Sequence, residues 1–144
     1  MSKEQQKILR YSQAINTLIT NTQTIQNKLN PLFETLKQHL KDNQADMAAA
    51  AYQKTLQAFI DGTNDYRNEL AKLTKAVAPA RLLGSHHSLV TAYRDYVAGC
   101  QQMVDSMHDD QTIDIDQFML AEKQQDAANM QITRCLRKLC VNYD

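Results

Sequence analysis

Residues 3–41 read KEQQKILRYSQAINTLITNTQTIQNKLNPLFETLKQHLK. Mostly apolar side chains recur in this stretch at intervals of three and four residues: Ile8, Tyr11, Ile15, Leu18, Thr22, Ile25, Leu29, Leu32, Leu36 and Leu40. Intervals of this kind match the turn of an α-helix, so these side chains share one face. The stretch therefore predicts an amphipathic helix that buries this face against other helices.

A proline lies inside this predicted helix. Pro31 cannot donate the backbone hydrogen bond of its position, and its ring crowds the preceding turn. The apolar stripe nevertheless stays in phase on both sides of it. We therefore predict one long helix over about residues 3–41, kinked near residues 27–31. A true break at Asn30 is the alternative.

The same spacing of apolar side chains occurs three more times, over residues 45–77, 82–107 and 118–139. The second helix is expected to begin after Asn43 and to end before Pro79. Pro79 suits the first turn of the third helix, because the backbone donor that it lacks would have no partner there. The third helix is expected to end in the acidic turn 108–110. Gly62 lies off the apolar stripe of the second helix, so it should weaken that helix without ending it.

Capping patterns and short connections complete the prediction of the fold. Ser2 and Gln5 have the spacing of a capping box at the start of the first helix, as Asp114 and Gln117 have at the start of the fourth. Short connections force neighbouring helices to run antiparallel. Residues 1–144 therefore predict a single all-α domain, an antiparallel up-and-down four-helix bundle.

Composition narrows the class of protein. The chain has 16 Lys and Arg against 16 Asp and Glu, which argues against a globally basic nucleic-acid binder. Its start has no apolar signal region, and no window approaches the ~18 apolar residues of a membrane span. We expect a cytoplasmic protein without a membrane span, although an exported chain whose signal had been removed would look the same. Cys100, Cys135 and Cys140 lack the close spacing of zinc ligands and are interpreted as reduced thiols.

The sequence does not predict a metal or cofactor site. A di-iron bundle requires inward-facing glutamates and Glu-x-x-His pairs, and no glutamate here precedes a histidine at that spacing or lies on a predicted core stripe. The glutamates are Glu4, Glu34, Glu69 and Glu122. His86 falls on the core stripe and is counted to lie near Cys135, but structural zinc takes four ligands. We expect His39, His87 and His108 to face solvent.

No catalytic residues are assigned. Nucleophilic catalysis needs Cys or Ser beside a histidine and a third orienting group in a cleft, which a filled bundle does not supply. The chain also lacks a Gly-rich phosphate loop and a dinucleotide fingerprint. We therefore expect a protein without enzymatic activity.

Counting residues from the turns predicts two neighbouring core layers. The first layer consists of Thr22, Thr63, Tyr93 and Ala128. In this layer, small side chains would make room for one large ring. The second layer consists of Ile25, Phe59, Tyr96 and Gln125. In that layer the buried amide could meet the tyrosine hydroxyl, and such polar groups are expected to fix the register of the helices.

Positive and negative side chains are equal in number over the whole chain, but they gather at opposite ends of the predicted bundle. One end gathers the candidate residues for binding an anionic partner, Lys72, Lys75, Arg81, Arg134, Arg137 and Lys138, to which the chain start adds Lys3, Lys7 and Arg10. The opposite end gathers Asp42, Asp46, Asp105, Asp109, Asp110, Asp114 and Asp116. Helix dipoles favour acidic starts and basic ends, which accounts for the second and fourth helices but not for the third. A solvated surface without a partner is the alternative.

Residues 79–93 read PARLLGSHHSLVTAY. This segment resembles the third-helix opening of uncharacterised helical-bundle domains of Gram-positive bacteria and their lipoproteins. The likeness rests on a proline that starts the helix and on His86, Leu89 and Tyr93 at helical spacing. It implies a helical-bundle fold and a bacterial source, and it implies no activity.

These observations favour a non-enzymatic interaction or adaptor protein. Its partner would be an unknown macromolecule or a second copy of the chain, with the basic end as the candidate surface. Nucleic acid is not expected as the partner. The alternative is a bundle that holds a small ligand or a metal near His86, Tyr93 and Cys135.

Overall fold

The computed structural model describes residues 1–41 and 47–141, with residues 140 and 141 described by their backbone alone. Four residues of the predictions therefore lie outside the described part, as does the Cys140 side chain. They are Asp42, Asn43, Ala45 and Asp46.

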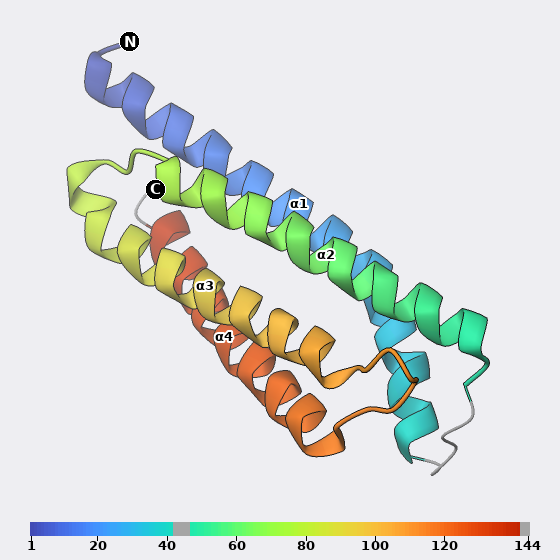
Figure 1. Ribbon diagram of the computed structural model, residues 1–144. Helices are drawn as coiled ribbons and strands as arrows, with labels where there is room; N and C mark the ends of the chain where they lie inside the picture. Colours follow the sequence, from blue (N-terminus) through green and yellow to red (C-terminus); the bar gives the residue numbers. More distant parts are fainter. Residues whose placement is uncertain (42–46, 142–144) are drawn as a thin grey trace.

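The described residues form four α-helices and one short 3-10 helix. These are α1 (Lys3–Lys41), α2 (Ala49–Lys75), η1 (Ala80–Leu82), α3 (Leu83–Ser106) and α4 (Ile115–Val141). Figure 1 shows the α-helices running up and down beside one another, α1 next to α2 and α3 next to α4. The predicted antiparallel four-helix bundle is confirmed. No helix in the described ranges is both long and apolar enough to cross a membrane.

α1 is a single helix that continues through Pro31, so the alternative of a break at Asn30 is wrong. In Figure 1 the last turns of α1, drawn in cyan, run at an angle to the blue part before them. The capping box at its start is complete. The amide of Gln5 donates to Ser2 Oγ at 3.1 Å, and the Ser2 amide donates to Gln5 Oε1 at 3.0 Å.

The starts of α2 and α3 differ from the prediction. α2 begins at Ala49, several residues after the expected point. Pro79 is followed by η1 rather than by an α-helix, because its extended backbone turns the chain and its carbonyl accepts the Leu82 amide at 2.9 Å. α3 then begins at Leu83. Both helices therefore begin later in the chain than predicted.

The turn between α3 and α4 is closed by backbone contacts. α3 ends at Ser106, before the predicted turn, and the Ser106 carbonyl accepts the amide of Asp114 at 2.8 Å. The carboxylate of Asp114 accepts the amide of Gln117 at 3.1 Å, so Asp114 is an N-cap, but the second bond of the predicted capping box is absent because the Asp114 amide donates to Ser106 instead. An isolated antiparallel bridge joins Met107 and Ile113 across the turn.

α3 and α4 make the closest helix pair of the bundle, because small side chains line the contact. The small buried residues recur at seven-residue intervals on both helices, as Ala92, Gly99 and Ser106 on α3 and as Ala121, Ala128 and Cys135 on α4. A Cβ added at Gly99 would lie 2.9 Å from Cγ of Gln125 and 3.4 Å from the Ala121 carbonyl oxygen. A side chain at Gly99 would therefore push the helices apart.

The opposite face of α3 carries tyrosines that pack on α1 and α2. Tyr93 is buried, and its hydroxyl shares a 2.9 Å hydrogen bond with Thr22 Oγ1, as the first predicted layer places them. The neighbour from α2 is Tyr66 rather than Thr63, with ring centroids 6.5 Å apart. The predicted layer is therefore off by about one helical turn at α2, and a second large ring stands where a small residue was expected.

The second predicted layer is also corrected. The Tyr96 hydroxyl donates to the Tyr66 hydroxyl at 3.4 Å, not to an amide of α4. The Gln125 amide donates instead to the Gly99 carbonyl at 3.1 Å and lies 3.7 Å from the sulfur of Met103. Its partner is an α3 carbonyl because the close α3/α4 contact brings that backbone within reach.

α2 continues through Gly62 as expected, but Gly62 and Glu69, which lie off the predicted stripe, are both buried. Gly62 is buried and faces α1, where an added Cβ would lie 2.6 Å from Leu29 Cδ1. Glu69 is also buried, and its carboxylate accepts hydrogen bonds from Asn21 Nδ2 at 3.1 Å and Lys72 Nζ at 3.2 Å. Both residues lie beside the apolar stripe, on the side that α1 covers. The buried face of α2 is therefore wider than its apolar residues indicate.

Candidate functional site

His86, proposed above as a possible ligand, is part of a buried pair with α1. Its Nδ1 and the Tyr11 hydroxyl share a 2.6 Å hydrogen bond, and the two rings meet edge to face with centroids 5.3 Å apart. Burial lowers the pKa of His86, and the nearby His87 lowers it further. The imidazole therefore favours its neutral form, which can accept the tyrosine proton.

Cys135 is buried at the surface of α4 that faces α3. It borders a surface hollow whose lining includes His87, Asp95 and Gln131. Among the residues that the structure describes, no three His, Cys, Asp or Glu side chains gather in a way that could hold a metal ion. His87 and His108 are exposed as expected, whereas His39 is half-buried.

The six candidate residues of the basic end are all exposed. They are Lys72, Lys75, Arg81, Arg134, Arg137 and Lys138. The helix ends that carry them, at α2, η1 and α4, lie together at one end of the bundle with the start of α1 (Figure 1). Lys72 is paired with Glu69 at 3.2 Å, so its charge is partly compensated.

Two hollows open near this end, and both have cationic rims over apolar floors. One, of about 620 Å³, lies between α1 and the end of α2 and is bordered by Lys3, Lys7 and Arg10. The other, of about 570 Å³, lies between α2 and α3 and is bordered by Arg67, Lys75 and Arg94. Neither hollow is lined by a carboxylate among the described residues.

Exposed apolar side chains accompany these cations. Val77, which borders the first hollow, is 66% exposed, and Leu83 at the start of α3 is 46% exposed. A protein partner could bury these two side chains on binding. The basic end therefore combines positive charge with apolar area.

Several aspartates of the acidic end have structural roles. Asp110 accepts hydrogen bonds from the amide and hydroxyl of Thr112, and these bonds lower the pKa of its carboxyl group. Asp114 caps α4, and Asp105 accepts a hydrogen bond from Gln101 at 2.8 Å. These contacts give Asp105, Asp110 and Asp114 roles within the fold.

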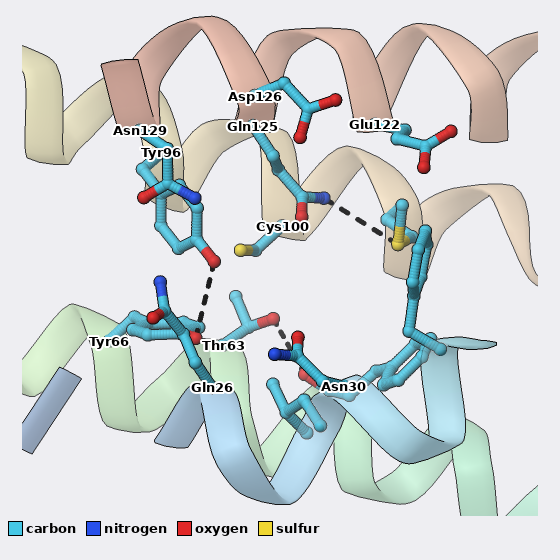
Figure 2. A pocket seen from close by; sticks show the side chains of 14 residues that line it. Gln26, Asn30, Thr63, Tyr66, Tyr96, Cys100, Glu122, Gln125, Asp126 and Asn129 are labelled. Carbon is cyan, nitrogen blue, oxygen red and sulfur yellow. Dashed lines mark hydrogen bonds between the residues drawn. The ribbon is translucent and has the colours of Figure 1, made fainter. Parts of the chain in front are cut away.

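A cavity of about 210 Å³ lies on the side of the bundle where α1 faces α4. It was not predicted from the sequence. Figure 2 shows Gln26 and Asn30 on one wall and four polar residues of α4 on the other. The lining consists of Gln26, Leu29, Asn30, Phe33, Phe59, Thr63, Tyr66, Tyr96, Cys100, Met103, Glu122, Gln125, Asp126 and Asn129. One feature of the sequence could have indicated this cavity, since α1 and α4 each carry amide side chains next to their apolar stripes.

The floor of this cavity is aromatic and uncharged. The rings of Tyr66 and Tyr96 meet edge to face with centroids 5.1 Å apart. Burial raises the pKa values of both hydroxyls and raises the pKa of the Cys100 thiol to about 12. These groups are therefore protonated at neutral pH and can donate hydrogen bonds.

The rim of the cavity carries negative charge. Glu122 is paired with Lys37 at 2.7 Å, so its charge is largely compensated. Asp126 is exposed on the same wall, one helical turn further along α4. Among the described residues, the lining contains two carboxylates and no cationic side chain. The net field at the mouth is therefore negative.

The chain was compared with protein-family models, curated proteins and solved structures. None of these comparisons gave a match. The resemblance of residues 79–93 to bacterial helical-bundle domains stays a prediction.

Proposed function

We propose that this chain is a non-enzymatic interaction protein that binds an acidic protein surface through its basic end. The observation that carries the proposal is the exposure of cationic side chains from four chain segments at one end of the bundle. Clustered charge of one sign steers an oppositely charged partner and raises its association rate.

The apolar side chains at this end favour a protein as the partner. Val77 and Leu83 would be buried by a protein surface that presents its own apolar residues between carboxylates. Phosphate backbones of nucleic acid would satisfy the cations but would leave these side chains in water. The two cation-rimmed hollows offer places where side chains of such a partner could insert.

Reversal of two charges tests the proposal. Arg134→Glu combined with Arg137→Glu should weaken partner capture at least about tenfold, because close charge pairs across an interface can each contribute more than 1 kcal/mol. The capture should also weaken steeply when salt rises past ~0.15 M, where the screening length is about 8 Å. Quantified pull-down at several salt concentrations, followed by purified-component binding, measures both effects.

The matched control reverses two exposed cations away from the basic end, Lys28→Glu with Lys123→Glu. This control should retain the partner. The melting temperatures of both double variants should stay close to that of the parent, since exposed charges contribute little to stability. Equal losses of partner binding in the two double variants would contradict an acidic protein as the partner. Binding of the parent protein only to anionic vesicles or DNA would contradict it as well.

A further inference from the structure

The cavity between α1 and α4 has the size of a small-molecule site. A cavity of about 150 Å³ in a protein core accepts benzene. The volume of about 210 Å³ here therefore has room for one six-membered ring with a short substituent. It is too small for most drug-sized ligands, whose pockets start near about 300 Å³.

The walls divide the cavity into two chemically different parts. The inner part is formed by the rings of Phe59, Tyr66 and Tyr96, which can contact an apolar body or the face of a ring. The outer part is formed by amides and carboxylates, which Figure 2 shows converging from α1 and α4: Gln26, Asn30, Glu122, Gln125, Asp126 and Asn129. A ligand with one apolar end and one polar end fits this arrangement.

The charge of the rim selects the polar end. Lys37 pairs with Glu122 at 2.7 Å and also acts on Asp126, so the two carboxylates of the rim exceed the one lysine near them. A carboxylate or phosphate on the ligand would meet two acidic side chains in the lining and no basic one. A positively charged group at the rim would meet Asp126 and the amide oxygens.

We propose that this cavity binds a small organic cation, with an ammonium group at the rim beside Asp126 and an apolar body against the aromatic floor. The site is independent of the basic end, which lies at the end of the bundle rather than on this side. A bare metal ion is not the occupant that these residues favour, because no three potential metal ligands gather in the described part of the chain.

Three probes of equal ring size and different charge test the proposal. Benzylammonium, benzyl alcohol and benzoate are titrated separately into the 15N-labelled protein, and the side-chain amide signals of Gln26, Asn30, Gln125 and Asn129 are followed. Benzylammonium should shift these four amide signals with a dissociation constant in about the millimolar range, which is ordinary for so small a molecule. Benzyl alcohol should bind at least about fivefold more weakly, and benzoate should leave the signals in place.

Two substitutions give the matched comparison. Asp126→Asn keeps the shape of the side chain and should weaken benzylammonium binding about fivefold, as loss of one exposed charge contact does. Asp65→Asn removes the same charge from the exposed surface of α2, outside the cavity lining, and should leave binding unchanged. Asn129→Phe should fill the mouth and abolish binding of benzylammonium and of benzyl alcohol.

Several results would overturn the proposal. Benzyl alcohol or benzoate binding as tightly as benzylammonium would show that charge does not select the ligand. Equal binding by the Asp126→Asn variant would remove the carboxylate from the site. Retained binding by Asn129→Phe, or shifts confined to amides elsewhere, would place the probe outside the cavity.

Discussion

The two faces of α3 pack against their neighbours in opposite ways. The face toward α4 carries Ala92, Gly99 and Ser106, and the helices there approach closely enough for the Gln125 amide to reach an α3 carbonyl. The face toward α1 and α2 carries Tyr93 and Tyr96, whose rings hold these helices at a greater distance. Small side chains bring α4 onto one face of α3, and large ones keep α1 away from the other.

This difference gives a physical reason for the cavity. α4 lies tight against α3, whereas α1 lies beyond the tyrosine rings, so the α1/α4 side is left with a space that no large apolar side chain fills. One helical turn away, the bond between Thr22 and Tyr93 joins α1 to α3. Further along α1, Gln26 and Asn30 line the cavity.

The largest effect is expected from removal of the ring that joins α3 to α1. Tyr93→Ala should reduce the free energy of unfolding by about 3 to 5 kcal/mol, as truncation of buried aromatic side chains does. Tyr93→Phe keeps the ring and loses only the hydrogen bond to Thr22, so it should lower the free energy of unfolding by about 1 kcal/mol. Urea denaturation followed by circular dichroism measures both. A loss below about 1 kcal/mol for the alanine variant would mean that the ring is not what holds this face together.

The small-residue face is broken by Gly99→Val. The added side chain would collide with Gln125 and the α4 backbone, so the free energy of unfolding should fall by about 1 to 3 kcal/mol. Gly84 gives the control on the same helix, because a Cβ there would meet nothing within 4 Å. Gly84→Val should change the stability by no more than about 0.5 kcal/mol. Similar losses at both glycines would show that helix propensity, not close packing, is the cause.

The start of the tyrosine-bearing face contains the pH-sensitive pair of His86 and Tyr11. Because the folded-state pKa of His86 is lowered, the unfolded chain binds the proton first as the pH falls. The stability should therefore be fully present above about pH 6.5, the ordinary pKa of histidine, and should decline as the pH falls below it. Melting temperatures from pH 7.5 to pH 5 should show this decline, and His86→Gln should flatten it. The exposed His108→Gln variant should keep the slope of the parent.

The smallest effect is expected at the cavity wall. Asn129→Leu places an apolar side chain of similar size where α1 and α4 leave space, so the free energy of unfolding should change by no more than about 0.5 kcal/mol. The same denaturation experiment measures it beside Gly99→Val. A loss as large as that of the glycine variant would mean that the α1/α4 side is packed as tightly as the α3/α4 side.

Local interactions made the secondary structure predictable. The repeated apolar stripes gave four helices, and the capping residues Ser2 and Asp114 act as their sequence positions indicate. The long helix through Pro31 followed from the unbroken stripe. The end of α2 at Lys75 followed from Pro79, because a proline restricts the residues before it. Each of these features depends on neighbours within about one helical turn.

The register between helices could not be read from the same stripes. Apolar residues repeat at every turn, so sliding α2 by one turn still pairs apolar with apolar, and Tyr66 rather than Thr63 meets Tyr93. The burial of Glu69 was missed because its hydrogen bonds come from Asn21 on another helix and from a neighbouring lysine. Polar contacts of this kind do not appear in the spacing of apolar residues.

The sequence by itself thus determined the four helices and the residues that cap α1 and α4, because these follow from short-range spacing. The cavity was decided only by the tertiary structure. It exists because Gly99 lets α4 approach α3 while Tyr96 keeps α1 at a distance, and no single helix carries that information. Amides and carboxylates that would otherwise face solvent separately, such as Gln26 and Asp126, face one another across the space that remains.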